Sequence, residues 1–180
     1  AMSYGAGIAF ELLAVTQDVR PQMPGIDRIG VFTKYPVPMS IEKIYPRSPL
    51  ESMAGWVHLP RLIDKVRLHL AGKLPEDYQP NYLNKGFDAR WLETAEVDGE
   101  KFVEVVKKSL TDGQVCDWVI KNVKVSDRVR NRFKDYIINY GREGDEVRAK
   151  LKQRKEESGI ADREDIQCFV DYIDADEGRI

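Results

Sequence analysis

The sequence predicts a mainly α-helical fold, a compact but irregular domain of about five or six helices with an extended N-terminal arm. After Pro49, apolar residues recur at the three- and four-residue spacing of helices that bury one face. Residues that cap helices stand directly before several of these stretches. Prolines and glycines instead punctuate the first 45 residues and favour extended segments and turns there. We therefore divide the chain into an arm at 1–45 and a helical domain at 46–180.

The arm itself is predicted to hold two short elements. Residues 4–19 could form a helix, and residues 29–33 could form one strand. Two interpretations of this region remain equally open. It either lies on the helical domain or on a second subunit, which would make the protein a homo-oligomer, or it is a partly disordered tail.

Composition excludes several classes of protein. The chain has 180 residues, 42% of them hydrophobic and 32% charged, with a formal net charge of -2, as in an ordinary soluble protein. Nucleic-acid binding would require a net basic patch, which this charge balance does not favour. No apolar run approaches the roughly 18 residues that span a membrane. We expect a soluble, cytoplasmic protein with neither a nucleic-acid nor a membrane partner.

Cysteine and histidine usage predicts neither a metal nor a cofactor. Cys116 and Cys168 are far apart and belong to no Cys-x-x-Cys motif, so we interpret them as buried, reduced thiols. His58 and His69 are separated by roughly 16 Å of helix, too far to share one ion. The sequence also lacks a P-loop, a GxSxG motif and a GxGxxG motif.

The first helix is predicted at residues 49–70. Ser48 precedes Pro49, and Glu51 stands three positions after Ser48, which is a capping box with proline at the first helical position. Gly72 would end this helix, because glycine readily adopts the left-handed conformation that follows a helix.

Polar residues gather on one side of this helix. At about 100° per residue, six apolar side chains share one arc, namely Trp56, Leu59, Leu62, Ile63, Val66 and Leu70, whereas Val57 and Leu68 fall on the opposite arc. The opposite arc carries His58, Arg61, Asp64, Lys65 and His69. Pro60 lacks an N–H group, so we expect a kink that leaves the Trp56 carbonyl free to accept a hydrogen bond. Arg67 lies at the edge of the apolar arc, where its guanidinium needs a carboxylate or a carbonyl.

Three more helix starts are marked by capping residues, namely Asp98, Thr111 and Ser126. The connection at 72–97 is long, and we expect one or two helical turns in it at 88–93. Residues 145–158 are charged nearly all round and predict a solvated face.

The C-terminal segment is predicted to start a last helix at an Asp162 cap. Several acidic residues follow within this segment, and their spacing does not match a calcium-binding loop. We interpret this acidic group as a solvated tail; it comprises Asp171, Asp174, Asp176 and Glu177.

The stretch PRSP at 46–49 and the run LPRLIDKVR at 59–67 resemble a bacterial family of unknown function, domain family 5069. The resemblance continues through Gly86-Phe87-Asp88-Ala89-Arg90 and Tyr172-Ile173-Asp174, and covers roughly residues 45–180. It implies no activity, since none is known for the family. It does imply that the polar residues of the motif serve more than solubility, as a ligand site or as a structural ion-pair network.

The first hypothesis is a site for a small anionic metabolite at the kinked helix, centred on Arg61, Asp64 and Lys65 and lining a concave pocket. The ligand-binding residues would be Arg47, Arg61, Lys65, Arg67 and Tyr78. Asp64 or His58 would orient the ligand or carry a proton, so they are the candidates for catalysis if the protein is an enzyme. Whether it is one stays open.

The alternative hypothesis is a non-catalytic structural or interaction module. The motif would then form a buried ion-pair clamp that fixes how helices cross, and residues 1–45 would contact a partner subunit.

Overall fold

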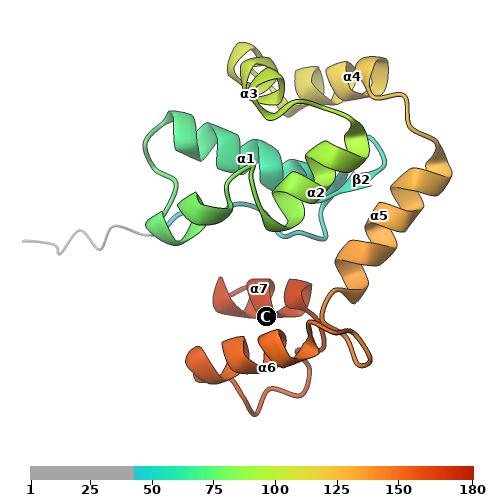
Figure 1. Cartoon of the computed structure of the whole chain (residues 1–180). Helices are drawn as coiled ribbons and strands as arrows, with labels where there is room; N and C mark the ends of the chain where they lie inside the picture. Colours follow the sequence, from blue (N-terminus) through green and yellow to red (C-terminus); the bar gives the residue numbers. More distant parts are fainter. Residues whose placement is uncertain (1–42) are drawn as a thin grey trace, which may run out of the picture. The chain divides into compact units, whose positions relative to one another are not determined.

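The computed structural model describes residues 43–180, so the helix and strand predicted at 4–19 and 29–33 lie outside the described residues. Within the described part the fold is mainly α, as predicted, with seven α-helices rather than five or six. The helices are α1 (Leu59–Leu70), α2 (Gly86–Ala95), α3 (Gly99–Lys108), α4 (Asp112–Asn122), α5 (Asp127–Asn139), α6 (Arg148–Glu157) and α7 (Phe169–Asp176) (Figure 1). Two short strands, β1 (Ser52–Met53) and β2 (Trp56–Val57), and a 3₁₀ helix, η1 (Glu76–Asn81), complete it.

The prediction of a kinked helix beginning at Pro49 is wrong. Residues 52–57 form an antiparallel hairpin instead, with Met53 paired to Trp56. Its turn places both Ala54 and Gly55 at positive φ, 52° and 77°, the backbone of a tight hairpin turn. Alanine rarely adopts this conformation, so the sequence carried no strong hairpin signal.

Helix α1 therefore begins directly before Pro60, which lies in its first turn. Proline is tolerated there because the first N–H groups of a helix have no partner inside it. The expected kink is absent from α1 for this reason. Ser48 caps no helix; its hydroxyl accepts from the Leu50 N–H at 3.1 Å and donates to Asp174 at 2.6 Å.

The three central caps are confirmed. The Asp98 carboxylate accepts from the Lys101 N–H at 2.9 Å at the start of α3. Thr111 opens α4 with a full capping box, and Ser126 opens α5. Helix α2 is longer than the one or two turns predicted.

The last helix starts later than predicted. Asp162 does not cap it; α7 begins after Cys168, and Asp171 caps it by accepting from the Gln167 and Cys168 N–H groups at 2.9 and 3.1 Å. Cys168 is buried, as expected, whereas Cys116 is only partly buried.

The core lies between the hairpin and helices α1 to α5. Trp56 of β2 contacts the rings of Trp91 and Phe133 edge-on, with centroids 5.7 and 5.5 Å apart. Trp91 also packs on Phe102 of α3. Such aromatic pairs bury large apolar areas and hold fixed geometries. The hairpin thereby packs against α2 and α5 directly before the start of α1.

Helices α6 and α7 pack on each other, and α7 also packs on α5 (Figure 1). Gly141 allows the chain to leave α5 close to α7. Its φ is +86°, and a Cβ there would lie 2.8 Å from the Phe169 ring, so only glycine fits without displacement. None of the described helices has the length and apolar character needed to cross a membrane.

Candidate functional site

Three of the five residues of the polar arc are buried rather than solvated, whereas Asp64 is partly buried and His69 is exposed. The exposed fractions of His58, Arg61 and Lys65 are only 1%, 3% and 7%. Buried charges are costly unless carboxylates or carbonyls compensate them. The partners of these three residues therefore define what the motif does.

Arg61 pairs with Glu177, which follows α7 near the end of the chain. Two guanidinium nitrogens reach the two carboxylate oxygens, Nη1 to Oε2 at 3.0 Å and Nη2 to Oε1 at 2.5 Å. This two-pronged geometry is the strongest form of a protein ion pair. Arg61 Nη1 also donates to the carbonyls of Pro46 and Arg47, at 3.3 and 2.7 Å. One side chain thus joins the PRSP segment, α1 and the C-terminal segment.

Tyr78 of η1 covers this pair. Its hydroxyl donates to Glu177, and its ring lies 5.6 Å from the Arg61 guanidinium and 5.7 Å from Lys65 Nζ. These distances are those of cation–π contacts. Burial, reinforced by Glu177, raises the pKa of Tyr78. The phenol therefore stays protonated at neutral pH and donates a hydrogen bond to Glu177.

The C-terminal segment is held by further contacts to the PRSP segment. Arg179 pairs with Asp174 at 2.9 Å and also with Glu177, and it donates to the Pro46 carbonyl. Asp174 in turn accepts the Ser48 hydroxyl. Two side chains of α7 and its C-terminal extension, Asp174 and Arg179, thus hold residues 46–48.

Lys65 and His58 share a second buried carboxylate, that of Asp88 on α2. Lys65 Nζ lies 2.9 Å from both Asp88 oxygens, and His58 Nε2 lies 2.8 Å from Oδ1. Burial would raise the pKa of Asp88, but Lys65 and His58 together hold it at about 2. Burial lowers the pKa of His58 to about 4, against the opposing effect of Asp88.

At neutral pH, His58 is therefore uncharged and donates its Nε2 proton to the Asp88 carboxylate. Its Nδ1 is then an acceptor, and it is buried with no hydrogen-bond partner among the described residues. Burial also lowers the pKa of Lys65. His58, Lys65 and Asp88 thus form a buried triad in which His58 Nδ1 is the acceptor left without a partner in the described part of the chain.

A third group of ion pairs lies at the edge of the cluster. Arg47 binds both oxygens of Asp64, at 2.7 and 2.8 Å, and its backbone N–H donates to the same carboxylate at 2.9 Å. Arg47 also lies 2.8 Å from Asp112 at the start of α4, and Arg67 reaches Asp112 at 2.5 Å. The Pro60 carbonyl accepts from Arg47 at 3.2 Å. The need for a carboxylate that the sequence predicted for Arg67 is thus met by Asp112.

We call these residues the signature clamp. Its cations are Arg47, Arg61, Lys65, Arg67 and Arg179. Its carboxylates are Asp64, Asp88, Asp112, Asp174 and Glu177. Every cation lies within ion-pair distance of at least one carboxylate, and the numbers of the two signs are equal. The clamp therefore has no surplus charge of either sign.

The structure brings together all seven residues that the sequence singled out for binding or catalysis. Their partners, however, were missed. Glu177 and Asp174 were interpreted as parts of a solvated tail, yet both are buried; this interpretation is wrong for the two of them. Asp88 stands in the Gly-Phe-Asp motif that carries the resemblance, which was the one available signal. Arg179 and Asp112 had no signal in the sequence.

Two cavities found in the described part of the chain lie away from the clamp, one against α6 and one between α3 and α4. Neither is lined by Arg61, Asp64 or Lys65. Among the described residues, no group of three or more histidine, cysteine, aspartate or glutamate side chains is placed to hold a metal ion.

A comparison with known protein families confirms the family resemblance of the PRSP and LPRLIDKVR stretches. The family model described as "Domain of unknown function (DUF5069)" matches residues 43–179. No curated protein matches the chain. The match spans the signature clamp from Arg47 to Arg179, as well as all seven helices of the described part. The chain therefore belongs to the DUF5069 family.

Proposed function

We propose that this protein is a non-catalytic interaction module in which the signature clamp locks the C-terminal helix against α1. The charge balance of the clamp is the observation that carries this proposal. Its five cations are matched by five carboxylates of the same chain. An anionic ligand would have to displace one of these carboxylates and leave it buried and unpaired, at a cost of several kcal/mol.

The partner in this proposal is a second copy of the chain, reached through residues 1–45. Exposed apolar side chains outside the clamp support an interaction role. Leu110, between α3 and α4, is 90% exposed, and Ile120 on α4 is more than half exposed. Light scattering on the full chain and on a shortened chain that begins at Pro46 tests this. A dimer that becomes a monomer on shortening supports the proposal, and a monomer in both cases contradicts it.

A small anionic metabolite bound by Arg61, Asp64 and Lys65 is the second candidate function. One observation favours it. Tyr78 covers Arg61 and Lys65, yet η1, the element that carries Tyr78, contains no buried residue. A segment with so little buried surface opens at low cost. Its movement would uncover the Arg61–Glu177 pair and let a ligand compete for the guanidinium.

Substitution of Arg61 separates the two candidates. In the clamp, Arg61→Ala leaves Glu177 with one cation fewer, and we expect the free energy of unfolding to fall by about 3–5 kcal/mol. The paired variant Arg61→Met/Glu177→Leu should recover much of this loss, because it removes both charges and fills their volume. Urea unfolding of the three proteins measures both effects.

A thermal-stability panel of small anions completes the test. If the second candidate is right, at least one compound raises the wild-type melting temperature by several degrees, and neither variant responds to it. If the clamp is purely structural, no compound acts through Arg61, and the single variant melts much earlier than the double variant.

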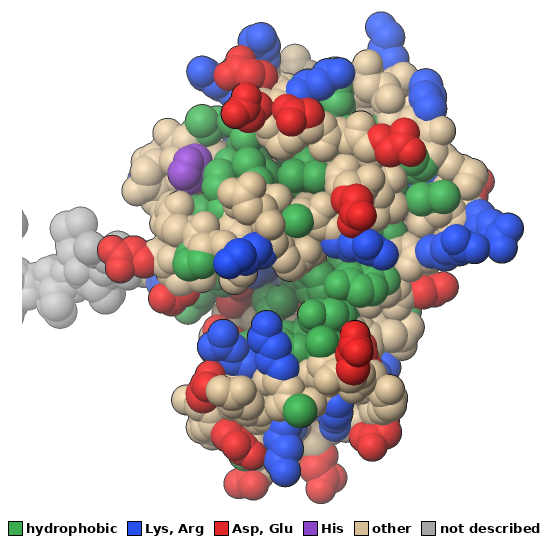
Figure 2. Space-filling model, in the orientation of Figure 1, with side chains coloured by type: hydrophobic (Ala, Val, Ile, Leu, Met, Phe, Trp, Pro, Cys, Tyr) green, Lys and Arg blue, Asp and Glu red, His purple; other side chains and the backbone are tan. Residues whose placement is uncertain are grey.

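A location in the bacterial cytoplasm is part of the same proposal. Cys116 and Cys168 form no disulfide, which fits the reducing bacterial cytoplasm. On the face shown in Figure 2, Lys and Arg side chains are interspersed with Asp and Glu side chains, a mixture that does not favour nucleic acid as a partner.

A further inference from the structure

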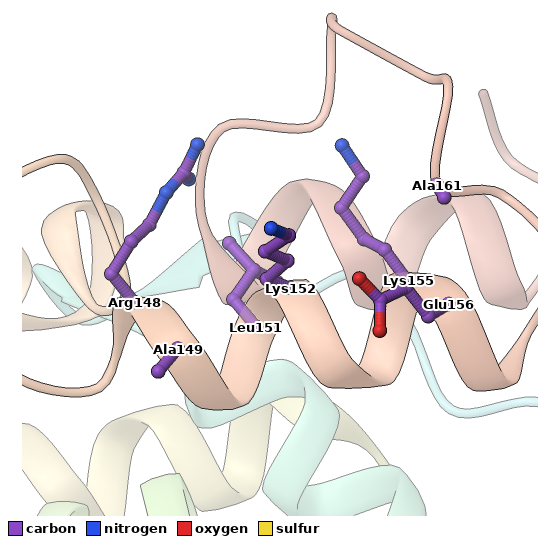
Figure 3. Close-up of a pocket in the computed structure, with 7 residues that line it drawn as sticks. All are labelled: Arg148, Ala149, Leu151, Lys152, Lys155, Glu156 and Ala161. Atoms are coloured by element: carbon purple, nitrogen blue, oxygen red, sulfur yellow. The ribbon is translucent and has the colours of Figure 1, made fainter.

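Helix α6 carries a cavity with a charge imbalance that the clamp does not have. The cavity has a volume of about 160 Å³. It is lined by Arg148, Ala149, Leu151, Lys152, Lys155, Glu156 and Ala161 (Figure 3). Three of these side chains are cations and one is a carboxylate. Outside the lining, the exposed Glu143 carboxylate lies 3.8 Å from Arg148 Nε, so the site with this neighbour keeps a surplus of one positive charge.

The three cations extend from the same side of α6. Figure 3 shows Arg148, Lys152 and Lys155 pointing toward the segment that follows the helix, while the Glu156 carboxylate lies lower on the helix. Residues three and four positions apart share one face of a helix, which is why positions 148, 152 and 155 converge.

Two of the cations are held in place by backbone carbonyls. Arg148 Nη1 donates to the Gln167 carbonyl at 2.9 Å and to the Gly141 carbonyl at 3.3 Å. Lys155 Nζ donates to the Arg163 carbonyl at 2.6 Å. A guanidinium has five N–H groups and an ammonium three, so both keep donors for a ligand. Ordering these side chains before binding reduces the entropy that a ligand must overcome.

Lys152 is different, because it makes no ion pair or side-chain hydrogen bond within residues 43–180. It is also exposed, so its ammonium group is free to turn toward an anion. The remaining lining of Ala149, Leu151 and Ala161 offers no side-chain hydrogen bonds. A bound group would therefore be recognised by the charges and N–H donors of the three cations.

The size of the cavity limits the ligand. Sites for drug-sized molecules measure roughly 300–1,000 Å³, well above this volume. We propose that the α6 cavity binds a small phosphate-type oxyanion, either inorganic phosphate or the phosphate of a small phosphomonoester. Arg148 and Lys155 would supply fixed donors, and Lys152 would close on the remaining oxygens. This site is independent of the signature clamp and of the interaction role proposed for the protein.

Calorimetric titration of the full chain with inorganic phosphate, at constant ionic strength set by chloride, tests the proposal. We expect saturable binding with a Kd below about 1 mM. Lys152→Ala should weaken it about tenfold, since one charge-assisted hydrogen bond is lost. Lys150→Ala is the matched control: it removes the same charge from an exposed position of the same helix outside the cavity lining. Its Kd should equal that of the wild type.

Substitution of Lys152 and Lys150 should leave the melting temperature within a few degrees of the wild type, because both side chains are exposed. Arg148 and Lys155 are poor test positions, because their bonds to backbone carbonyls also hold neighbouring loops in place.

Titration with methyl phosphate distinguishes inorganic phosphate from a phosphomonoester as the ligand. Tighter binding than that of inorganic phosphate indicates a phosphomonoester that uses the apolar lining, and weaker binding indicates free phosphate.

Two results would overturn the proposal. One is an absence of saturable phosphate binding by the wild type at millimolar concentrations. The other is an equal loss in Lys152→Ala and Lys150→Ala, which would mean that the helix attracts anions only through its overall charge. A short DNA duplex that binds with this equal loss would assign the surface to polyanions instead.

Discussion

Helices α1 and α6 are both rich in charged residues, yet they use them in opposite ways. On α1, the cations pair with carboxylates distant in sequence: Arg61 with Glu177, 116 positions away, and Lys65 with Asp88, 23 positions away. On α6, the ion pair of Arg154 with Glu157 spans only three positions. Helix α1 carries its charges opposite an apolar stripe and buries them in a network, whereas α6 is charged nearly all round and presents a largely solvated surface.

The difference lies in what packs over each helix. Helix α1 is covered on its polar side by the PRSP segment, by η1 and by the C-terminal segment, and each cover brings a carboxylate, a carbonyl or an aromatic ring. Of the α6 residues only Leu151 is buried, so most of the charged side chains of α6 remain in contact with water. The charged face of an amphipathic helix such as α1 therefore does not reveal whether it is buried until its long-range partners are known.

The largest effect should come from Glu177→Ala. This change leaves Arg61 buried without its carboxylate and removes the acceptor of Tyr78, so we expect a loss of about 3–5 kcal/mol in the free energy of unfolding. Asp176→Ala is the control, because Asp176 is its exposed neighbour. Equal unfolding midpoints in urea for the two variants would show that Glu177 contributes nothing beyond its surface charge.

The next effect is a dependence of stability on pH through His58. Its pKa falls from 6.5 to about 4 on folding, so the unfolded chain binds the proton more tightly between these values. Stability is then fully present above pH 6.5 and is lost as the pH falls to about 4, by about 3 kcal/mol. The lowered pKa of Asp88 continues the loss toward pH 2.

His58→Asn sharpens this prediction. Asparagine tolerates the positive φ of 67° at this position and does not titrate. The part of the stability profile between pH 6.5 and 4 that is due to His58 should flatten in the variant. Chemical unfolding at stepped pH values measures both profiles, and an unchanged slope in the variant would exclude His58 as its source.

A smaller effect is expected at the edge of the clamp, from Arg47→Ala. The Arg47 side chain is 31% exposed, and the backbone N–H that also binds Asp64 survives the substitution. We expect a loss of about 2 kcal/mol, the cost of hydrogen bonds to a partly solvated charge. Arg47→Lys should recover part of it. A loss as large as that of Glu177→Ala would mean that the edge is as tightly coupled as the buried centre.

The smallest effect should come from Arg154→Ala on α6. Its pair with Glu157 joins side chains that are each about half exposed, and such pairs contribute little. The free energy of unfolding should change by no more than about 0.5 kcal/mol. A loss above 1 kcal/mol would remove the contrast between α1 and α6.

Much of the fold could be predicted because helix caps are local. Asp98, Thr111 and Ser126 each bind an N–H three positions away, so their roles are visible within four residues of sequence. The hairpin before α1 could not be predicted in the same way. Its turn places Ala54 at positive φ, a conformation that alanine rarely adopts and that no local residue pattern signals.

The sequence predicted the residues that α1 contributes to the candidate site but not their distant partners. The motif indicated the cations of α1 and the acid Asp64, because they share a helical face at fixed spacing. It could not indicate that Glu177 and Arg179 return to the same place, since no local pattern encodes a contact between residues over a hundred positions apart.

By itself, the sequence determined the helical class, the starts of α3, α4 and α5, and the polar face of α1, because each of these follows from spacing along a single segment. Only the tertiary structure decided that this face is buried, which carboxylates neutralise it and that Pro60 begins a helix rather than bending one. Those outcomes depend on which distant segments pack together, and burial turns an ordinary charged face into a network in which every charge needs a partner.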